Sequence, residues 1–529
     1  MDKKIVRYED FGAIGDGVTD DFDALYAAHI YANENHLPVT ASEGAVYYIG
    51  EKFNKTIPLK TDLCLKGAKI IVDDTVDNAF EFRQLALYTF DRDRQPTVYD
   101  TEAIASLNTE KIDIGQKKVE WLGALAGERC MVMLVNDNHK DFVRFGSNEN
   151  AGKARSECIL IDADGTVDPS TPVVFNFDDF TAITIFPIDD DPITLEGGYF
   201  ENICCRACAA TEYKNKYRSF ARGIRVHRPN SVIRGVTHRV VNEPKITGEL
   251  NESYPYYGFI GCINTYNVLV EDADLCGHTT YYEDKPARES TNWVKPKPVP
   301  MGSYDIIEGN SILITYRRLR QNATDIRARR YWGIMASNGC KNLEFYDSVF
   351  SRFDAHCGVW GAKIVNCELG HAFNLVGGGR IEVINTKKHG SRFINVRGDY
   401  GSDFGGDVII KDCTLLCDSL YYDEPKEEES EEAIIFNLGF RGDNEKYCNW
   451  DFGYPCHMPR NIVMDNFTCP AREVAMFNSI EDLAFDKNNK NPYALTENIT
   501  FVGMKPYKMI SGGDGSAVME SINITVEPS

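Results

Sequence analysis

The amino-acid sequence predicts an all-β protein, a right-handed single-stranded parallel β-helix. Three observations carry this prediction: short segments of alternating apolar residues recur, they recur about every 20 residues, and each ends in a small or amide-bearing turn residue. The most regular segments begin at residues 342, 362, 380 and 407. Self-similarity at roughly 20 residues, with one strand in each repeat, is typical of stacked solenoids whose coils bury one another's apolar faces.

The same pattern continues on both sides of this series. Similar segments occupy residues 230–235, 267–272 and 310–315 upstream, and 461–466, 498–503 and 521–526 downstream. The longer intervals there indicate loops inserted into some coils. Asparagine at a fixed phase suits a left-handed turn and can stack into a hydrogen-bonded ladder. A leucine-rich repeat would need a recurring Leu-x-x-Leu-x-Leu frame, which the sequence lacks.

The first 50 residues predict a cap on the N-terminal end of this solenoid. A Gly-rich turn is followed by Thr19, which can cap a helix, and by an amphipathic stretch that ends near Asn35. Such a helix would cover the open strand edge of the first coil. We therefore expect a cap over residues 1–50 and a β-helix over residues 51–529. Insertions are expected at about 85–155, 280–305 and 416–458.

Bulk properties exclude several classes of function. The net charge of −22 argues against a general nucleic-acid-binding face. The sequence contains no run of about 18 apolar residues, so no membrane span is predicted. No apolar leader follows the first Met, so a cytoplasmic location is expected. The 16 cysteines are then expected to be free thiols. Cys205 and Cys208 form a C-x-x-C with no second pair at ligand spacing, so no metal site is expected.

Polar residues recur at one phase in successive coils, 12 to 17 residues past the start of each. Because equal phases stack about 4.8 Å apart in a β-helix, these residues should line one groove. The candidates for catalysis are Asp354, His356, Asp325 and Asp399. The candidates for substrate binding are Arg327, Arg392, Arg397, Tyr400, Asn374, His278 and Trp332. Carboxylates for proton transfer, arginines for hydroxyls or carboxylates, and rings for stacking are what a glycan groove requires.

Three of the catalytic candidates also have a structural interpretation. Asp354 could satisfy backbone amides as an Asx-turn residue. Asp325 could form only a salt bridge with Arg327. His356 could be a packed histidine with its hydrogen bonds satisfied.

The segment from Asp10 to Asp21, Asp-Phe-Gly-Ala-Ile-Gly-Asp-Gly-Val-Thr-Asp-Asp, resembles the opening of the rhamnogalacturonase/pectate-lyase-like superfamily. That superfamily includes glycoside hydrolase family 28 and phage tail-spike proteins. The resemblance implies a β-helix that acts on carbohydrate. Phe353-Asp-Ala-His356 also resembles the Phe-Asp-Pro-His core of mannuronan C5-epimerases, although the epimerases' tyrosine three residues before the Asp is Ser351 here.

Three functions follow from these patterns. The first, which the sequence favours, is a glycoside hydrolase in which Asp354 and Asp325, or Asp399, act as acid and base. The second is a polysaccharide lyase or C5-epimerase, in which arginine or Ca²⁺ neutralises a uronate and His356 or Tyr400 abstracts a proton. The third is a non-catalytic, tail-spike-like glycan-binding protein. The expected partner is a poly- or oligosaccharide, with homo-oligomers allowed, and no cofactor is expected apart from Ca²⁺ in a lyase.

Overall fold

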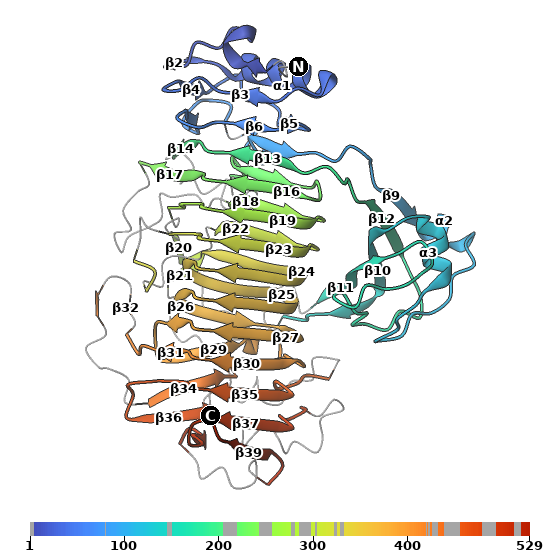
Figure 1. Cartoon of the computed structure of the whole chain (residues 1–529), viewed down its shortest axis with the longest axis vertical. Helices are drawn as coiled ribbons and strands as arrows, with labels where there is room; N and C mark the ends of the chain where they lie inside the picture. Colours follow the sequence, from blue (N-terminus) through green and yellow to red (C-terminus); the bar gives the residue numbers. More distant parts are fainter. Residues whose placement is uncertain are drawn as a thin grey trace.

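The computed structural model shows a parallel β-helix with one lateral excursion (Figure 1). The predicted fold class is confirmed. The structure describes residues 5–79, 81–144, 151–204, 220–242, 257–276, 281–284, 298–301, 304–321, 325–327, 333–418, 420–421, 424–425, 432–438, 455–478, 493–512 and 520–529.

One long ladder of parallel strands runs the length of the helix. Its members are β13 (Ile193–Glu196), β16 (Ser231–Arg234), β19 (Tyr266–Glu271), β23 (Ile312–Arg317), β24 (Ile334–Tyr346), β25 (Val349–Val365), β27 (Gly377–Ile384), β30 (Asp407–Lys411), β35 (Asn461–Asp465), β37 (Asn498–Val502) and β39 (Asn523–Glu527). The register aligns the same phase in successive coils, as the repeat predicts. Leu343, Ala362, Ile381 and Val408 pair in series, and each is buried in the helix interior.

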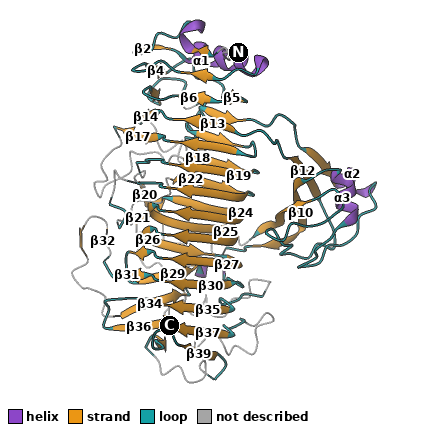
Figure 2. Cartoon of the chain, viewed as in Figure 1, coloured by secondary structure: helices purple, strands orange, loops and turns teal. Residues whose placement is uncertain are grey.

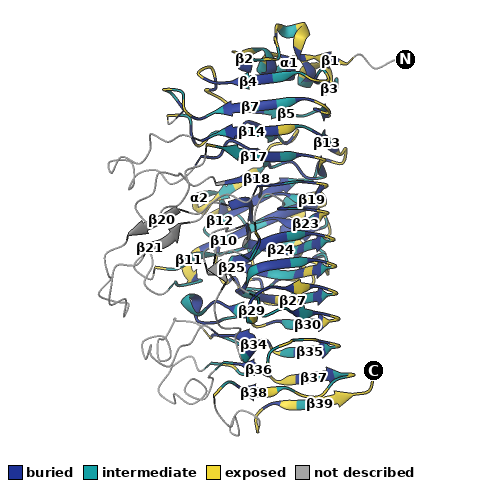
Figure 3. Cartoon of the chain, turned by 90° about the vertical axis from the view of Figure 1, so that its left-hand side faces the viewer, coloured by how far each residue is buried: buried dark blue, intermediate teal, exposed yellow. Residues whose placement is uncertain are grey.

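The other walls are parallel ladders as well. One contains β8 (Tyr88–Phe90), β15 (Ile224–Val226), β18 (Tyr257–Ile263) and β22 (Tyr304–Gly309), and continues through β24 and β25 to β26 (Glu368–Leu375), β29 (Arg392–Val396), β34 (Glu432–Asn437), β36 (Glu473–Phe477) and β38 (Lys508–Ile510). A five-stranded sheet contains β2 (Asp16–Asp20), β4 (Val46–Ile49), β7 (Lys69–Asp73), β14 (Tyr199–Ile203) and β17 (Thr237–Val241). The inward side chains of these walls form one continuous apolar core. Buried residues run along the stacked strands of the helix (Figure 3).

Asparagine and aspartate turns end the strands, as expected. Asp347, Asn366 and Asn385 all have positive φ, between 45° and 55°. The Asn366 amide donates to Asp347 Oδ1 at 3.1 Å, and the Asn385 amide donates to Asn366 Oδ1 at 2.8 Å. Short polar side chains are the non-glycine residues that tolerate this conformation best. The turns therefore carry both the backbone reversal and a side-chain ladder along the axis.

The N-terminal cap contains α1 (Phe22–Asn35), which lies over the first coils (Figure 1). Phe22, Leu25 and His29 are buried against the core. The prediction that Thr19 caps the helix is wrong, because Thr19 lies in β2 and its hydroxyl donates to Asp16. Asp21 occupies the cap position instead, and its carboxylate accepts from the backbone amides of Ile14 and Gly15 rather than from the helix.

The lateral excursion is a small antiparallel unit with its own core. It contains β9 (Thr97–Asp100), β10 (Cys130–Asp141), β11 (Lys153–Ile161) and β12 (Ala182–Pro187), with the short helices α2 (Thr101–Ala105) and α3 (Glu120–Ala126) (Figure 2). It thus extends about 30 residues beyond the insertion expected at 85–155. In the region 280–305, β20 (Tyr281–Asp284) pairs with β21 (Pro298–Met301). Most of the insertion expected at 416–458 lies outside the described residues.

Three α-helices, α1, α2 and α3, occur in the described part of the chain, and none of its helices has the length and apolarity that crossing a bilayer requires.

Candidate functional site

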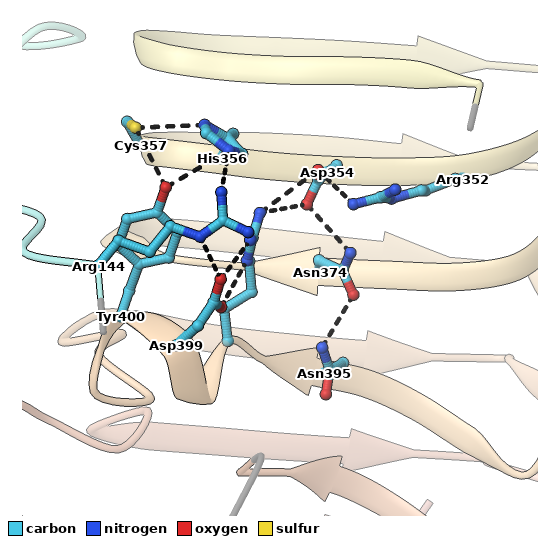
Figure 4. A network of polar contacts seen from close by, with 10 residues as sticks. Arg144, Arg352, Asp354, His356, Cys357, Asn374, Asn395, Asp399 and Tyr400 are labelled. Atoms are coloured by element: carbon cyan, nitrogen blue, oxygen red, sulfur yellow. Dashed lines mark hydrogen bonds and ion pairs between the residues drawn. The ribbon is translucent and has the colours of Figure 1, made fainter. Parts of the chain in front are cut away.

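Six of the predicted site residues lie in one polar network (Figure 4). The network crosses three coils because β25 carries Asp354 and His356, β26 carries Asn374, and β29 leads into the 3₁₀ turn η4 (Gly398–Tyr400). Arg397, Asp399 and Tyr400 come from that turn and the residue before it. The stacked register aligns Asp354 with Asn374 and Asn374 with Asn395. Equal phase along the helix therefore brings these residues together, as the sequence pattern indicated.

Asp354 is completely buried at the centre of this network. Its carboxylate pairs with Arg352, accepts from Arg397 Nη1 at 3.1 Å, and accepts from the Asn374 amide at 3.0 Å. Burial alone would raise the pKa of Asp354, but the positive charges of Arg352 and Arg397 outweigh it and lower the pKa to about 2. The predicted groove-lining catalytic carboxylate is therefore an ionised interior group, which fixes two arginines and has no surface open to a substrate.

Asp399 is the second carboxylate of the network. It accepts from Arg397 Nε at 3.0 Å, from Arg397 Nη2 at 2.7 Å and from Arg144 Nε at 2.7 Å. Burial raises the pKa of Asp399, but the Arg397 charge and hydrogen bond and the charge of Arg144 hold it well below its usual range. Its side chain remains 26% exposed. Asp399 is therefore ionised, and it positions the two guanidinium groups beside His356.

His356 lies between a thiol, a phenol and a guanidinium. Its Nδ1 is 3.3 Å from Cys357 Sγ, and its Nε2 is 3.4 Å from both Tyr400 Oη and Arg144 Nη1. Burial, together with the charge of Arg397, lowers the pKa of His356 to about 4. Because a guanidinium can only donate hydrogen bonds, we assign the lone pair to Nε2 and the proton to Nδ1. The imidazole is therefore neutral at pH 7, and its basic nitrogen points at two donors.

Tyr400 is a buried neutral phenol. Burial raises its pKa above the usual value near 10, and the neighbouring thiol of Cys357 adds to this effect. Its ring meets that of His356 edge-on at 5.7 Å, and the guanidinium of Arg397 lies 4.8 Å from the ring centre. Tyr400 can therefore donate a proton or hydrogen bond to His356 but does not ionise near neutral pH.

Arg144 is the member that the sequence pattern missed. It follows β10 in the lateral unit, outside the repeat, so no coil phase marks it. Its side chain is 39% exposed, which makes it the most accessible charged group of the network. The nearby rings of Phe142, Phe175 and Trp360 pack edge to face and join the lateral unit to β25. The site is thus built by the β-helix and completed by the excursion.

Asp325 and Arg327 lie in a different cluster. Arg327 pairs with Asp325 at 2.6 Å and lies 3.9 Å from Asp418. His389 sits beside them, with Nε2 2.8 Å from Glu368 and Nδ1 2.9 Å from Asp418. Within the described residues, no contact joins Asp325 to Asp354, so the expected carboxylate pair does not form. The salt-bridge interpretation of Asp325 holds.

The remaining candidates are Arg392, His278 and Trp332. Arg392 is exposed at the first position of β29 and is not among the residues joined in Figure 4. His278 and Trp332 lie outside the described residues. A separate cleft of about 630 Å³ lies where the lateral unit leaves the helix, lined by Arg94, Arg129 and a run of acidic residues at 189–191, and it contains no residue of the network.

Comparison with known proteins supports the fold of this chain and nothing beyond the fold. No model of a protein family matches the chain, and no curated protein matches it. The tailspike Gp54 of Acinetobacter baumannii bacteriophage AP22, solved with a capsular saccharide, is 9% identical with a TM-score of 0.49 over 99% of this chain and 74% of its own. The tailspike gp49 of Pseudomonas phage LKA1 is 11% identical, with a TM-score of 0.47 over 97% and 84% of the two chains.

The surface adhesin PfbA of Streptococcus pneumoniae is 11% identical, with a TM-score of 0.41 over 99% of this chain and 91% of its own. Tailspikes and an adhesin are therefore among the structural neighbours of this chain. Because the identities are this low and the TM-scores are below 0.5, these neighbours do not indicate which ligand this chain binds.

Proposed function

We propose that this protein acts on an acidic, uronate-containing glycan by removing the proton on the carbon next to the sugar carboxylate. The observation that supports this best is the neutral His356, whose basic Nε2 lies 3.4 Å from a phenol and from a guanidinium. Proton abstraction at such a carbon needs a base, a proton donor and a cation that neutralises the carboxylate. His356, Tyr400 and Arg144 supply one of each.

Arg144 is the carboxylate-binding group in this proposal. Its Nε is engaged by Asp399, which fixes the plane of the guanidinium, while 39% of the side chain faces solvent. A planar guanidinium matches a carboxylate with two parallel hydrogen bonds. Charge neutralisation of the uronate makes its C5 proton more acidic, and the bound anion raises the pKa of His356 toward the working pH.

The reaction then balances within the network. His356 Nε2 takes the C5 proton, the electrons form the C4=C5 double bond, and the C4–O bond breaks. Tyr400 gives its proton to the departing glycosidic oxygen and recovers one from the His356 imidazolium, to which its hydroxyl lies close. Return of a proton to the opposite face of C5, without bond cleavage, would give epimerisation instead. Both outcomes share the same first step.

The electrostatics favour this reaction over paired-carboxylate hydrolysis at the same place. A glycosidase acid must hold a proton near neutral pH, which requires a raised pKa. The arginines instead hold the pKa values of Asp354 and Asp399 below their usual range. Neither carboxylate can therefore serve as the acid.

A second candidate function is glycoside hydrolysis at the His389 cluster, which consists of Asp325, Arg327, Glu368, His389 and Asp418. Glu368 and Asp418 are 41% and 42% exposed, and each contacts one nitrogen of His389. Asp325 lies nearby through Arg327, but the hydrogen bond from Arg327 lowers its pKa, so Glu368 or Asp418 would have to supply the acid. Accessible carboxylates flanking one point are the groups that glycoside hydrolysis uses. If the protein hydrolyses a glycan, this cluster is the place where we expect it.

One assay separates the two functions. The 529-residue chain is incubated with polygalacturonate, alginate and neutral glycans, and ultraviolet absorbance of unsaturated uronate is followed beside reducing-end release. We expect absorbance with an acidic glycan, lost in His356→Gln and in Tyr400→Phe. Lys411→Gln, which removes an exposed ion pair with Asp465, should keep full activity.

Reducing ends without absorbance, abolished by Glu368→Gln, would transfer the function to the His389 cluster. Epimerisation is detected as exchange of the C5 proton in deuterated water. Absence of turnover and of exchange on every acidic glycan would overturn the proposal.

A further inference from the structure

A second set of chemically reactive side chains lies inside the β-helix, away from the network above. His238 in β17, Cys276 after β19 and Asp305 in β22 are all buried, and one ligand atom from each lies within 4.8 Å of the others. They come from three successive coils. Imidazole, thiolate and carboxylate are the three side-chain ligands that Zn²⁺ takes in proteins.

The orientation of His238 suits a metal ligand. Its Nε2 is 2.8 Å from the side-chain oxygen of Asn202, one coil earlier. An amide oxygen only accepts, so Nε2 carries the proton and Nδ1 carries the lone pair. Nδ1 is the nitrogen that faces Cys276, at 3.9 Å from Sγ. Phe259 stacks flat on the ring, with centroids 3.9 Å apart and planes within 7°, and fixes its rotation.

Asp305 is positioned in the same manner. The Gln321 amide donates to Asp305 Oδ2, and the Gln321 oxygen accepts from the backbone amide of Ser351. Metal ligands in proteins are typically oriented by such outer hydrogen bonds. His238 and Asp305 therefore each have an outer partner that directs a donor atom toward the shared point.

We propose that His238, Cys276 and Asp305 form an interior Zn²⁺ site that links three coils of the β-helix. The charge balances, because one thiolate and one carboxylate neutralise a divalent cation, with the thiol proton released on binding. Zinc bonds of about 2.0–2.3 Å require the donors to close to roughly 3.3–3.8 Å from one another. The 3.9 Å between Nδ1 and Sγ nearly meets this already.

The site goes beyond the glycan function and does not depend on it. Its expected role is structural, because the donors are buried and connect residues 38 and 29 positions apart in the chain. Metal binding then contributes directly to folding stability, since an unfolded chain holds no preformed site. The competing interpretation is a polar ladder inside the helix that binds no metal.

The test uses the 529-residue chain and the metal ion alone. The protein is stripped with a chelator, titrated with Co²⁺ without oxygen, and monitored for the thiolate-to-cobalt charge-transfer band; zinc content and Tm are measured in parallel. We expect one tight equivalent of metal and a raised Tm. Cys276→Ala should lose the band and the tight equivalent, whereas Cys262→Ala, which removes another buried thiol of the same interior, should keep both.

Asp305→Asn provides a second variant in case Cys276→Ala does not fold. It keeps the thiol, so the band should persist while affinity falls at least about tenfold, the lower end of what even an outer partner contributes. A wild-type protein that shows no thiolate band would overturn the proposal in favour of the polar ladder. An unchanged band in Cys276→Ala, or unchanged affinity in Asp305→Asn, would do the same.

Discussion

Individual buried histidines make the stability of this protein sensitive to acid. His29 lies on the buried face of α1 with Nε2 2.9 Å from the hydroxyl of Tyr8, and burial lowers its pKa to about 3. The unfolded chain takes up a proton near pH 6.5, whereas the folded chain does so only near pH 3. The free energy of unfolding should therefore fall as pH drops from about 6.5 to 3, by up to about 1.4 kcal/mol per pH unit.

The variant His29→Gln removes this titration and keeps a side chain that can bond Tyr8. We expect its urea midpoint to depend less on pH than that of wild type between pH 7 and pH 4. His356, whose pKa is lowered to about 4, adds to the same slope in both proteins. Asp354 adds nothing there, because its stabilisation is complete above its unfolded pKa of 3.8 and is lost only as pH falls through about 2. Parallel curves for variant and wild type would contradict the assignment of His29.

We expect the main role of Asp354 to be stabilisation of the fold. Asp354→Asn removes the carboxylate that pairs with Arg352 and leaves Arg397 with Asp399 as its remaining counter-ion. Removing one member of a buried ion pair costs about 3–5 kcal/mol, so we expect a loss of that order in chemical unfolding. Lys411→Gln, which breaks an exposed pair, should change the free energy of unfolding by less than about 1 kcal/mol. Equal effects of the two variants would show that the network does not hold Asp354 as described.

At the scale of elements, the turn ladder provides the next prediction. Asn366 has φ of 55°, and its amide contacts both neighbouring turns. Asn366→Gly keeps the permitted conformation and loses the two hydrogen bonds, whereas Asn366→Ala also incurs the left-handed strain of roughly 1–2 kcal/mol. We expect Ala to destabilise more than Gly, by about that amount, in thermal or urea unfolding. The reverse order would mean that the turn conformation contributes little.

The elements also show what the sequence could predict. Strands, turns and the coil phase follow from local patterns, so the stacking of Asp354 on Asn374, each 12 residues past the start of its segment, was predictable from residue counting alone. Counting failed for Asp325 because its coil connects β23 to β24 through a longer path, which moves the residue out of phase with Asp354. The prediction that Thr19 caps the helix failed because its hydroxyl donates to Asp16 instead.

Contacts between segments far apart in the chain could not be predicted from the sequence. Arg144 belongs to the lateral unit, and only the packing of that unit on β25 brings it to His356. His238, Cys276 and Asp305 lie in coils of unequal length, so no fixed spacing identifies them as neighbours. The proposed ligands come together by stacking of coils, so no short ligand motif marks them in the sequence.

At the scale of the whole molecule, the lateral unit is clamped to the β-helix (Figure 1). Met131, Leu160 and Phe186 of the unit pack on Ile312 of β23. Beside this apolar contact, Lys341 Nζ of β24 lies 2.6 Å from Glu157 Oε1 of β11, and both side chains are completely buried. Because Arg144 reaches His356 from this unit, the clamp also determines whether the candidate site is assembled.

The last prediction tests that clamp with a double-mutant cycle. Lys341→Met should leave Glu157 buried without its cation and cost about 3–5 kcal/mol, and Glu157→Gln should strand the lysine at a similar cost. Glu157 also accepts the backbone amides of Val174 and Phe175, which a glutamine oxygen can still accept only in part. The double variant removes both charges, so it should be less destabilised than the sum of the single variants by about 0.5–3 kcal/mol.

The cycle is measured by urea unfolding, with limited proteolysis to follow release of the lateral unit. If the clamp assembles the site, each single variant should also lose uronate turnover in proportion to the population in which the unit is released, and the double variant should recover part of it. Additive free energies would show that the two charges do not act as a pair. Undiminished turnover in a chain whose lateral unit is cleaved away would show that Arg144 takes no part in the reaction.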